Sequence, residues 1–227
     1  MSGLTMFFGV MGAIAQNDIR KVLSFHIVSQ IGYMVMGLAL FTPLALAGSI
    51  FYIIHHILVK TNLFLISGII KETNGYYKLK KLGSVYNLFP FVTLLFVISA
   101  FSLAGIPPLS GFWGKFILAK AGLELEQYFI VAVSLLVGFL TLFSMSKIWR
   151  SVFWSPAPAK YKKEIRYDGR SLFKSKYAMI LSSAFLAAFT LLLSFFPDLL
   201  STFSQEAAEQ LLNPSIYVDA VLKTNYK

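Results

Sequence analysis

The chain has 227 residues, of which 57% are hydrophobic and 13% are charged, and its formal net charge is +10. A soluble domain carries about 25% charged residues, so this composition is typical of a membrane protein and excludes an ordinary soluble fold. Because the chain contains no cysteine, disulfides and thiolate metal sites are also excluded.

Apolar segments of about the length that spans a bilayer recur along the whole chain. They predict an all-α fold, a polytopic membrane protein with about six transmembrane helices, one of them discontinuous. The expected spans are 2–15, 22–41, 46–70, 89–123, 128–147 and 177–196.

The second segment carries polar side chains on one helical face. His26, Gln30 and Tyr33 fall at helical spacing, and Ser29 lies beside them. Two interpretations stay open, because such residues either extend a polar track or hold neighbouring helices together. We place His26 among the candidates for a proton or ion path, and Ser29 and Gln30 as weaker candidates. Lys21, before the segment, is a further weak candidate.

The third segment contains a lysine where a membrane protein tolerates it least. A charge at bilayer depth costs at least about 2.5–3.5 kcal/mol, and such residues normally mark an ion or proton path. Tyr52, His56 and Lys60 are spaced by four and share one face. They predict a path through Lys60 and His56, with Tyr52 as a weaker member. The alternative for Lys60 is pairing with a carboxylate, but the expected spans contain none. His55 points about 100° away from His56, and we expect an ordinary core histidine there.

The fourth segment is broken by prolines and glycines and carries the second lysine. Pro107 and Pro108 remove backbone donors and stop a helix, and Gly105 and Gly111 flank them. Broken helices in transporters place free carbonyls and helix ends near the midplane. Lys115 follows about one turn later, so we expect its ammonium beside those groups. The alternative is a simple kink with Lys115 reaching outward, but the segment continues for about 12 Å beyond it.

The basic residues predict the orientation in the membrane. Most of the 20 Lys and Arg residues lie in three loops, at 20–21, 71–81 and 147–176, whereas the loops 42–45 and 124–127 contain none. The positive-inside rule makes the basic loops cytoplasmic and both termini external. Because topology and contact with anionic lipid explain the positive charge, we do not expect nucleic-acid binding.

Three segments also resemble the motifs of a known family. They are QNDIRKVLSFHIVSQIGYM, IFYIIHHILVKTNLFLISG and LAGIPPLSGFWGKFIL. They are similar to the antiporter-like subunits shared by Mrp cation/proton antiporters and respiratory complex I, an NADH:quinone oxidoreductase. Within this family the D-type subunits of the Mrp antiporters are the most similar.

The resemblance implies a division of the chain and a role for each candidate. The implied parts are a second half-channel module at 1–147 with the broken helix 89–123, a basic cytoplasmic connector at 148–176, a final transmembrane helix at 177–196 and an external or interfacial tail at 197–227. Lys60 and His56 would form the central relay, and Lys115 the outlet. Because family members carry a first module as well, we expect this chain to be the C-terminal part of something longer.

The predicted function is that of a membrane subunit of a monovalent cation (Na⁺)/proton antiporter in the plasma membrane of a prokaryote. Its expected partners are other membrane subunits of a hetero-oligomeric complex, Na⁺ and H⁺, and lipid. Two alternatives stay open: a proton-pumping subunit of an NADH:quinone oxidoreductase, or a truncated scaffold without transport. We predict no catalytic residue, cofactor or metal site.

Overall fold

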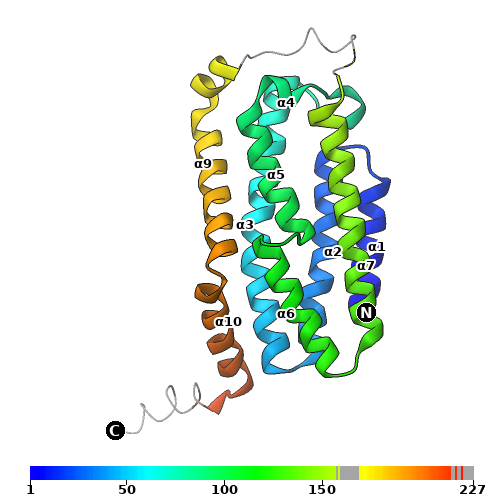
Figure 1. The fold of residues 1–227 in the computed structure, drawn as a ribbon, viewed down its shortest axis with the longest axis vertical. Helices are drawn as coiled ribbons and strands as arrows, with labels where there is room; N and C mark the ends of the chain where they lie inside the picture. Colours follow the sequence, from blue (N-terminus) through cyan, green and yellow to red (C-terminus); the bar gives the residue numbers. More distant parts are fainter. Residues whose placement is uncertain (157, 159–168, 216–217, 219–220, 222–227) are drawn as a thin grey trace.

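The computed structural model describes residues 1–156, 158, 169–215, 218 and 221, and the regular structure of these residues is helical (Figure 1). The elements are α1 (Ser2–Ala15), α2 (Ile19–Leu40), α3 (Pro43–Asn74), η1 (Leu79–Lys81), α4 (Val85–Leu88), α5 (Pro90–Ala104), α6 (Ser110–Glu124), α7 (Tyr128–Ile148), η2 (Trp149–Trp154), α9 (Gly169–Phe195) and α10 (Pro197–Leu212). Within the described residues, four helices are long and apolar enough to cross a membrane, namely α2, α3, α7 with η2, and the part of α9 from Lys176. The predicted all-α, polytopic membrane fold is confirmed.

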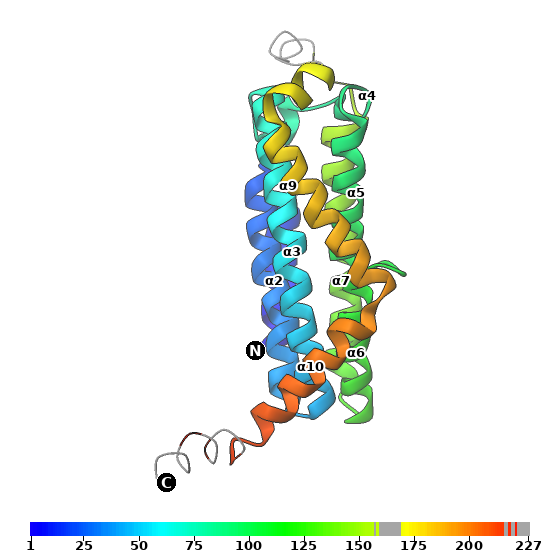
Figure 2. The ribbon, with the colours of Figure 1, turned by 90° about the vertical axis from the view of Figure 1, so that its left-hand side faces the viewer.

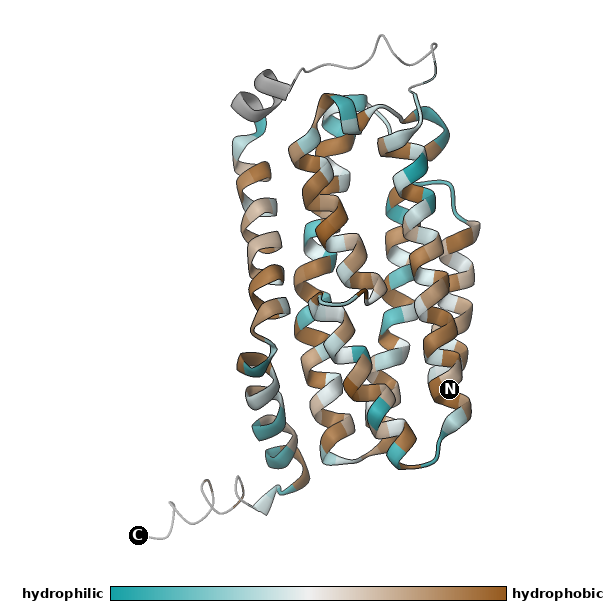
Figure 3. Cartoon of the chain, viewed as in Figure 1, coloured by the Kyte–Doolittle hydropathy of each residue, from teal (hydrophilic) through white to brown (hydrophobic). Residues whose placement is uncertain are grey.

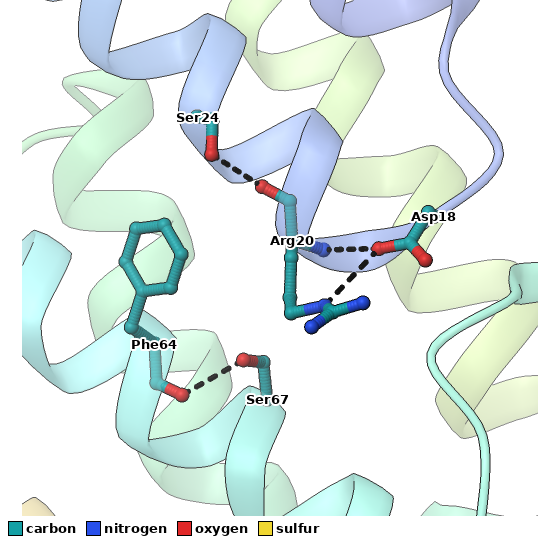
Figure 4. A network of polar contacts seen from close by, with 5 residues as sticks. All are labelled: Asp18, Arg20, Ser24, Phe64 and Ser67. Carbon is teal, nitrogen blue, oxygen red and sulfur yellow. Dashed lines mark hydrogen bonds and ion pairs between the residues drawn. The ribbon is translucent and has the colours of Figure 1, made fainter.

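Local chemistry sets the helix ends. Asp18 precedes α2 and accepts a hydrogen bond from the backbone N–H of Arg20 at 3.0 Å, and the Arg20 guanidinium lies 3.6 Å from the same carboxylate (Figure 4). Thr42 caps α3 in the same way, and Pro43 follows at its first position. Gly75 ends α3 in the left-handed conformation, with φ of 80°. These caps make α3 longer than the predicted span 46–70.

The helix α3 is the centre of the bundle. It packs against α2, α5, α6, α9 and α10, while α1 packs against α2 and α7. Figure 2 shows α9 running obliquely from α3 toward α6, after which α10 returns across the foot of α3. There Ala208 of α10 lies in one apolar cluster with Leu46 and Ala47. Figure 3 shows that α10 is more hydrophilic than α9, as expected of an interfacial segment.

The predicted broken helix is two helices placed end to end. The helix α5 ends at Ala104 and α6 begins at Ser110, and the peptide bond between Pro107 and Pro108 in the connection is cis. Gly105 has φ of 88°, which favours glycine because a Cβ is crowded in this conformation. The break lies at mid-height in the bundle, next to α3 (Figure 1).

The basic loops meet at one end of the bundle. Asp18 and Lys78 form an isolated β-bridge, and Lys176 pairs with Glu72 at 3.1 Å. The backbone N–H of Ser84 donates to the carbonyl of Ser155 at 2.8 Å. The connector predicted at 148–176 begins with the helical turns of η2, and Phe153 in these turns stacks on Phe96 with ring centroids 4.5 Å apart. Much of the connector lies outside the described residues.

Candidate functional site

Lys115 lies at the break and binds backbone oxygens that the break exposes. Its Nζ donates to the carbonyls of Leu103 and Ala104 at 3.0 and 3.1 Å. These carbonyls belong to the last turn of α5, where the helix dipole is negative and no intrahelical donor follows. The Nζ also lies 4.8 Å from the centroid of the Tyr33 ring. The structure thus places the ammonium beside the freed carbonyls, rather than reaching outward.

A cavity opens beside Lys115. Its volume is about 360 Å³, and Tyr33, Gly105, Ser134 and Gly138 are among its lining residues. The cavity therefore touches α2, the break and α7 together. Most of its lining is apolar, with Ile106, Phe112 and Leu142 among the residues that surround the few polar groups.

Lys60 lies in a different setting, between α3 and α2. Its side chain is buried, and its Nζ donates to the carbonyl of Leu23 at 3.0 Å. Lys60 and His56 both line a cavity of about 660 Å³, and Nε2 of His56 has no hydrogen-bond partner. Among the described residues no buried side chain is an Asp or a Glu. The balancing charge for Lys60 is therefore absent from this part of the chain.

Tyr52 lies between the two lysine environments. Its ring centroid is 5.5 Å from that of Tyr33 and 6.4 Å from that of His56. Its hydroxyl donates to the side-chain oxygen of Gln30. Gly114 allows α6 to approach, since a Cβ there would lie 2.8 Å from Cδ2 of Tyr52. Tyr52 thus bridges α3, α2 and α6.

His55, which the sequence argument treats as an ordinary core residue, is fully buried and lies at the break. Its Nδ1 lies 2.9 Å from Oγ of Ser110, which in turn lies 3.0 Å from Oγ of Ser102. Its Nε2 has no partner and lies close to Gly111, where a Cβ would be 2.9 Å away. The backbone N–H of Ser110 donates to Oγ of Ser194 at 2.8 Å, so α9 also reaches the break. His55 therefore contacts the start of α6 at the break between α5 and α6.

The polar residues of α2 contact different neighbouring helices. Oγ of Ser29 donates to the carbonyl of Met6 at 2.8 Å, which holds α1 and α2 together. Nε2 of His26 lies 2.9 Å from Oγ of Ser144 on α7, while its Nδ1 has no partner. Lys21 is exposed at the start of α2, away from both lysine environments.

The path candidates form no continuous chain of direct bonds. Within the described part of the chain no hydrogen bond joins Lys60, His56 and Lys115 to one another. The two cavities lie on either side of Tyr52, beside Lys60 and Lys115 respectively. Any proton transfer between them therefore needs water in these cavities.

The sequence and structure comparisons with known proteins find relatives of the same kind. Residues 1–141 match the family described as NADH:quinone oxidoreductase/Mrp antiporter, TM. The D-type subunit of the Na⁺/H⁺ antiporter of Alkalihalophilus pseudofirmus is 47% identical over 223 residues, which are 98% of this chain and 44% of the relative. A chain in the structure of the Mrp complex from Dietzia sp. DQ12-45-1b is 35% identical with a TM-score of 0.86, over 97% of this chain and 48% of that one.

A more distant structural relative shares the fold alone. A chain of respiratory complex I from Thermus thermophilus with bound NADH superposes with a TM-score of 0.75 at 20% identity, over 92% of this chain and 43% of that one. The chain therefore spans about half the length of the relatives it matches.

Proposed function

The chain belongs to the NADH:quinone oxidoreductase/Mrp antiporter transmembrane family, and from this premise we propose that it is part of a membrane subunit of a Na⁺/H⁺ antiporter complex. One observation supports this most strongly. Lys60 and Lys115 lie inside the bundle beside cavities and bond only to backbone carbonyls, without a buried carboxylate among the described residues. A lysine that serves only as structure is normally paired with an opposite charge.

The proposed mechanism is a relay of protons through water and side chains. Lys60 and His56 exchange protons across their shared cavity, and Lys115 exchanges them across the cavity at the break. Tyr52 and Tyr33 lie between the two cavities. The carbonyls of Leu103 and Ala104 stabilise the protonated form of Lys115, so this residue holds a proton before release.

The proposed relay needs an opposite charge from elsewhere in the assembly. Positive charges at Lys60 and Lys115 repel each other. A nearby carboxylate would shift the equilibrium of each lysine between its protonated and deprotonated forms. Relatives are about twice as long as this chain. We therefore propose that the remainder of the protein or a neighbouring membrane subunit of a hetero-oligomeric complex supplies the carboxylate.

The basic end of the bundle is proposed to face the cytoplasm of a prokaryotic cell. This end carries the loops around Arg20, Lys80 and Lys176, and the positive-inside rule assigns them to that side. Lys80 and Glu124 are exposed at the two ends, so a cysteine at either position tests the assignment. An impermeant thiol reagent applied to intact cells should label Glu124→Cys and spare Lys80→Cys. The reverse pattern would overturn the orientation.

The antiporter is favoured over a proton-pumping subunit of an NADH:quinone oxidoreductase by similarity. The D-type antiporter chain is 47% identical, whereas the complex I chain is 20% identical and shares only the fold. The two functions differ in what drives proton movement, which is a cation gradient in one and quinone reduction in the other. Proton movement that requires NADH and quinone and ignores Na⁺ would select the second function.

The test is substitution of each lysine in the assembled complex. Lys60→Ala and Lys115→Ala should each abolish Na⁺-driven proton exchange in membrane vesicles, with normal amounts of protein in the membrane. Lys120→Ala is the matched control, because Lys120 is exposed on α6 and pairs with Glu124 at the surface. The complex with Lys120→Ala should show Na⁺-driven proton exchange at the normal rate. Normal exchange by both Lys60→Ala and Lys115→Ala would refute the relay.

A further inference from the structure

A line of polar contacts joins α2 and α7, and it shares only Tyr33 with the relay described above. Nε2 of His26 lies 2.9 Å from Oγ of Ser144, and Nε2 of Gln30 donates to Oγ1 of Thr141 at 3.4 Å. Deeper in the bundle the Tyr33 hydroxyl donates to the backbone carbonyl of Ser134. All these side chains are buried. We call the set the α2–α7 lane, and it consists of His26, Gln30, Tyr33, Ser134, Thr141 and Ser144.

The lane runs between two defined places. Its inner end opens into the Lys115 cavity, whose lining includes Tyr33, Ser134 and Gly138. A Cβ on Gly138 would lie 3.9 Å from the Tyr33 hydroxyl and 4.0 Å from the carbonyl of Ala104, which binds Lys115. The lane's outer end lies at His26 and Ser144, and His26 is about two helical turns from the start of α2 at Ile19. From Ser134 to Ser144 the lane covers about 15 Å of helical rise.

A residue at the outer end marks the boundary with the basic loops. Lys147 lies one turn beyond Ser144, and its Nζ donates to the carbonyls of Ile14 and Gln16 at 2.9 and 2.7 Å. It thereby holds the end of α1 against α7. The lane therefore begins near the contact between the end of α1 and α7.

The lane differs from a purely structural polar contact. Asn62 of α3 donates to Ser99 of α5 at 2.8 Å and accepts from Ser183 of α9, so both ends of its amide are satisfied. In the lane, by contrast, Nδ1 of His26 is buried without a partner. A buried polar atom without a partner is destabilising, and a bound water removes this cost. Imidazole and hydroxyl groups both donate and accept, so with water they form a proton-conducting chain.

We propose that the α2–α7 lane is a proton entry that connects the basic end of the bundle with Lys115. The ligands that it takes are water and the proton. The proposal rests on the proposed transport function, and it assigns Ser144 and Thr141 as path residues and gives His26 its place at the mouth. Lys115 then receives protons without passing them through Lys60.

Cysteine accessibility tests whether water enters the lane. The chain has no cysteine, so Ser144→Cys and Thr141→Cys introduce single reporters. Met145→Cys is the matched control, because Met145 is next to Ser144, is 1% exposed and lies in the apolar cluster. Open membranes carrying the assembled complex are treated with a small charged methanethiosulfonate, and modification is read on this chain after its isolation. Modification should be fastest at position 144, slower at 141 and at least about tenfold slower at 145 than at 144.

Two labelling results would overturn the proposal. Equal rates at positions 144 and 145 would mean that the lane is as dry as the apolar core. Faster modification at 141 than at 144 would mean that water enters from the Lys115 cavity rather than from the basic end.

Transport measurements separate this proposal from the function on which it rests. Thr141→Val, which keeps the shape but removes the hydroxyl, should slow exchange about tenfold, the factor that corresponds to one lost hydrogen bond on the path. Thr141→Ser should restore it, and Ser183→Ala in the α3–α9 contact should leave it unchanged. Normal exchange by Thr141→Val, with Lys60→Ala inactive, would overturn the lane alone. Normal exchange by Lys60→Ala and Lys115→Ala would overturn the relay, whereas modification of the cysteine at 144 would still show a wet lane.

Discussion

Lys60 and Lys115 lie in the same bundle but in unequal environments. Lys115 is held by two carbonyls at a helix end and by the face of Tyr33, whereas Lys60 has one carbonyl and a neighbouring histidine nitrogen without a partner. The chain therefore surrounds the Lys115 ammonium with more groups that stabilise a positive charge than it places around the Lys60 ammonium. We propose from this difference that Lys115 is a site built by this chain, and that Lys60 depends on the rest of the assembly.

Arginine substitutions at the two lysines should give the largest decrease in exchange rate, because arginine keeps the positive charge but cannot release a proton. A guanidinium does not deprotonate in proteins. Lys115→Arg and Lys60→Arg should therefore each lower exchange about 100-fold or more, the usual contribution of a proton-transferring group. Lys115→Arg should retain full assembly, because the carbonyls of Leu103 and Ala104 accept from a guanidinium as well. Exchange rates and yields of assembled complex check this, and active Arg variants would show that charge alone suffices.

Two glycine-to-alanine substitutions, one at the break between α5 and α6 and one beside the α2–α7 lane, should differ in their effect on stability. At Gly111 a Cβ would lie 1.9 Å from the carbonyl of Ser102 and 2.9 Å from Nε2 of His55, so Gly111→Ala forces α5 and α6 apart. We expect a loss of about 3 kcal/mol in stability, at the upper end for overpacking. Gly138→Ala, whose Cβ meets only ordinary contacts at 3.9 and 4.0 Å, should be neutral. Melting temperatures of the purified complexes measure both, and equal values would contradict the tight packing at the break.

A smaller effect is expected where α9 supports the break. Ser194→Ala removes the acceptor of the Ser110 backbone N–H, and a buried donor without a partner should cost about 1.5 kcal/mol. Ser204→Ala on α10 is the control, because its hydroxyl is buried but bonds only to the carbonyl of Leu200 in its own helix. The control should change the melting temperature little. If Ser204→Ala lowers it as much as Ser194→Ala does, the contact of α9 with the break contributes nothing specific.

The sequence predicts the helices and the break well, because both depend on local composition. Runs of apolar residues set the spans, and Pro107 and Pro108 set the break, so the position of Lys115 relative to it follows from spacing alone. The roles of Lys60, His56 and Lys115 stay predictions.

The sequence does not predict which residues of different helices contact one another. His55 joins the break only because that face of α3 meets α6, and Ser194 reaches Ser110 across 84 residues. Thr141 also bonds to the carbonyl of Val137 in its own helix, as serine and threonine in membrane helices commonly do. Such a residue gives no sign in the sequence of its second contact with Gln30.

The most direct measurement of the central claim compares this chain alone with the complete assembly. The described part of the chain buries Lys60, half-buries Lys115 and buries no carboxylate, so the relay should work only when another part of the complex supplies the opposite charge. Liposomes containing the purified 227-residue chain should keep their pH gradient when Na⁺ is added, and liposomes containing the assembled complex should lose it. Robust exchange by the chain alone would contradict the account, because Lys60 and Lys115 would then form a self-sufficient path.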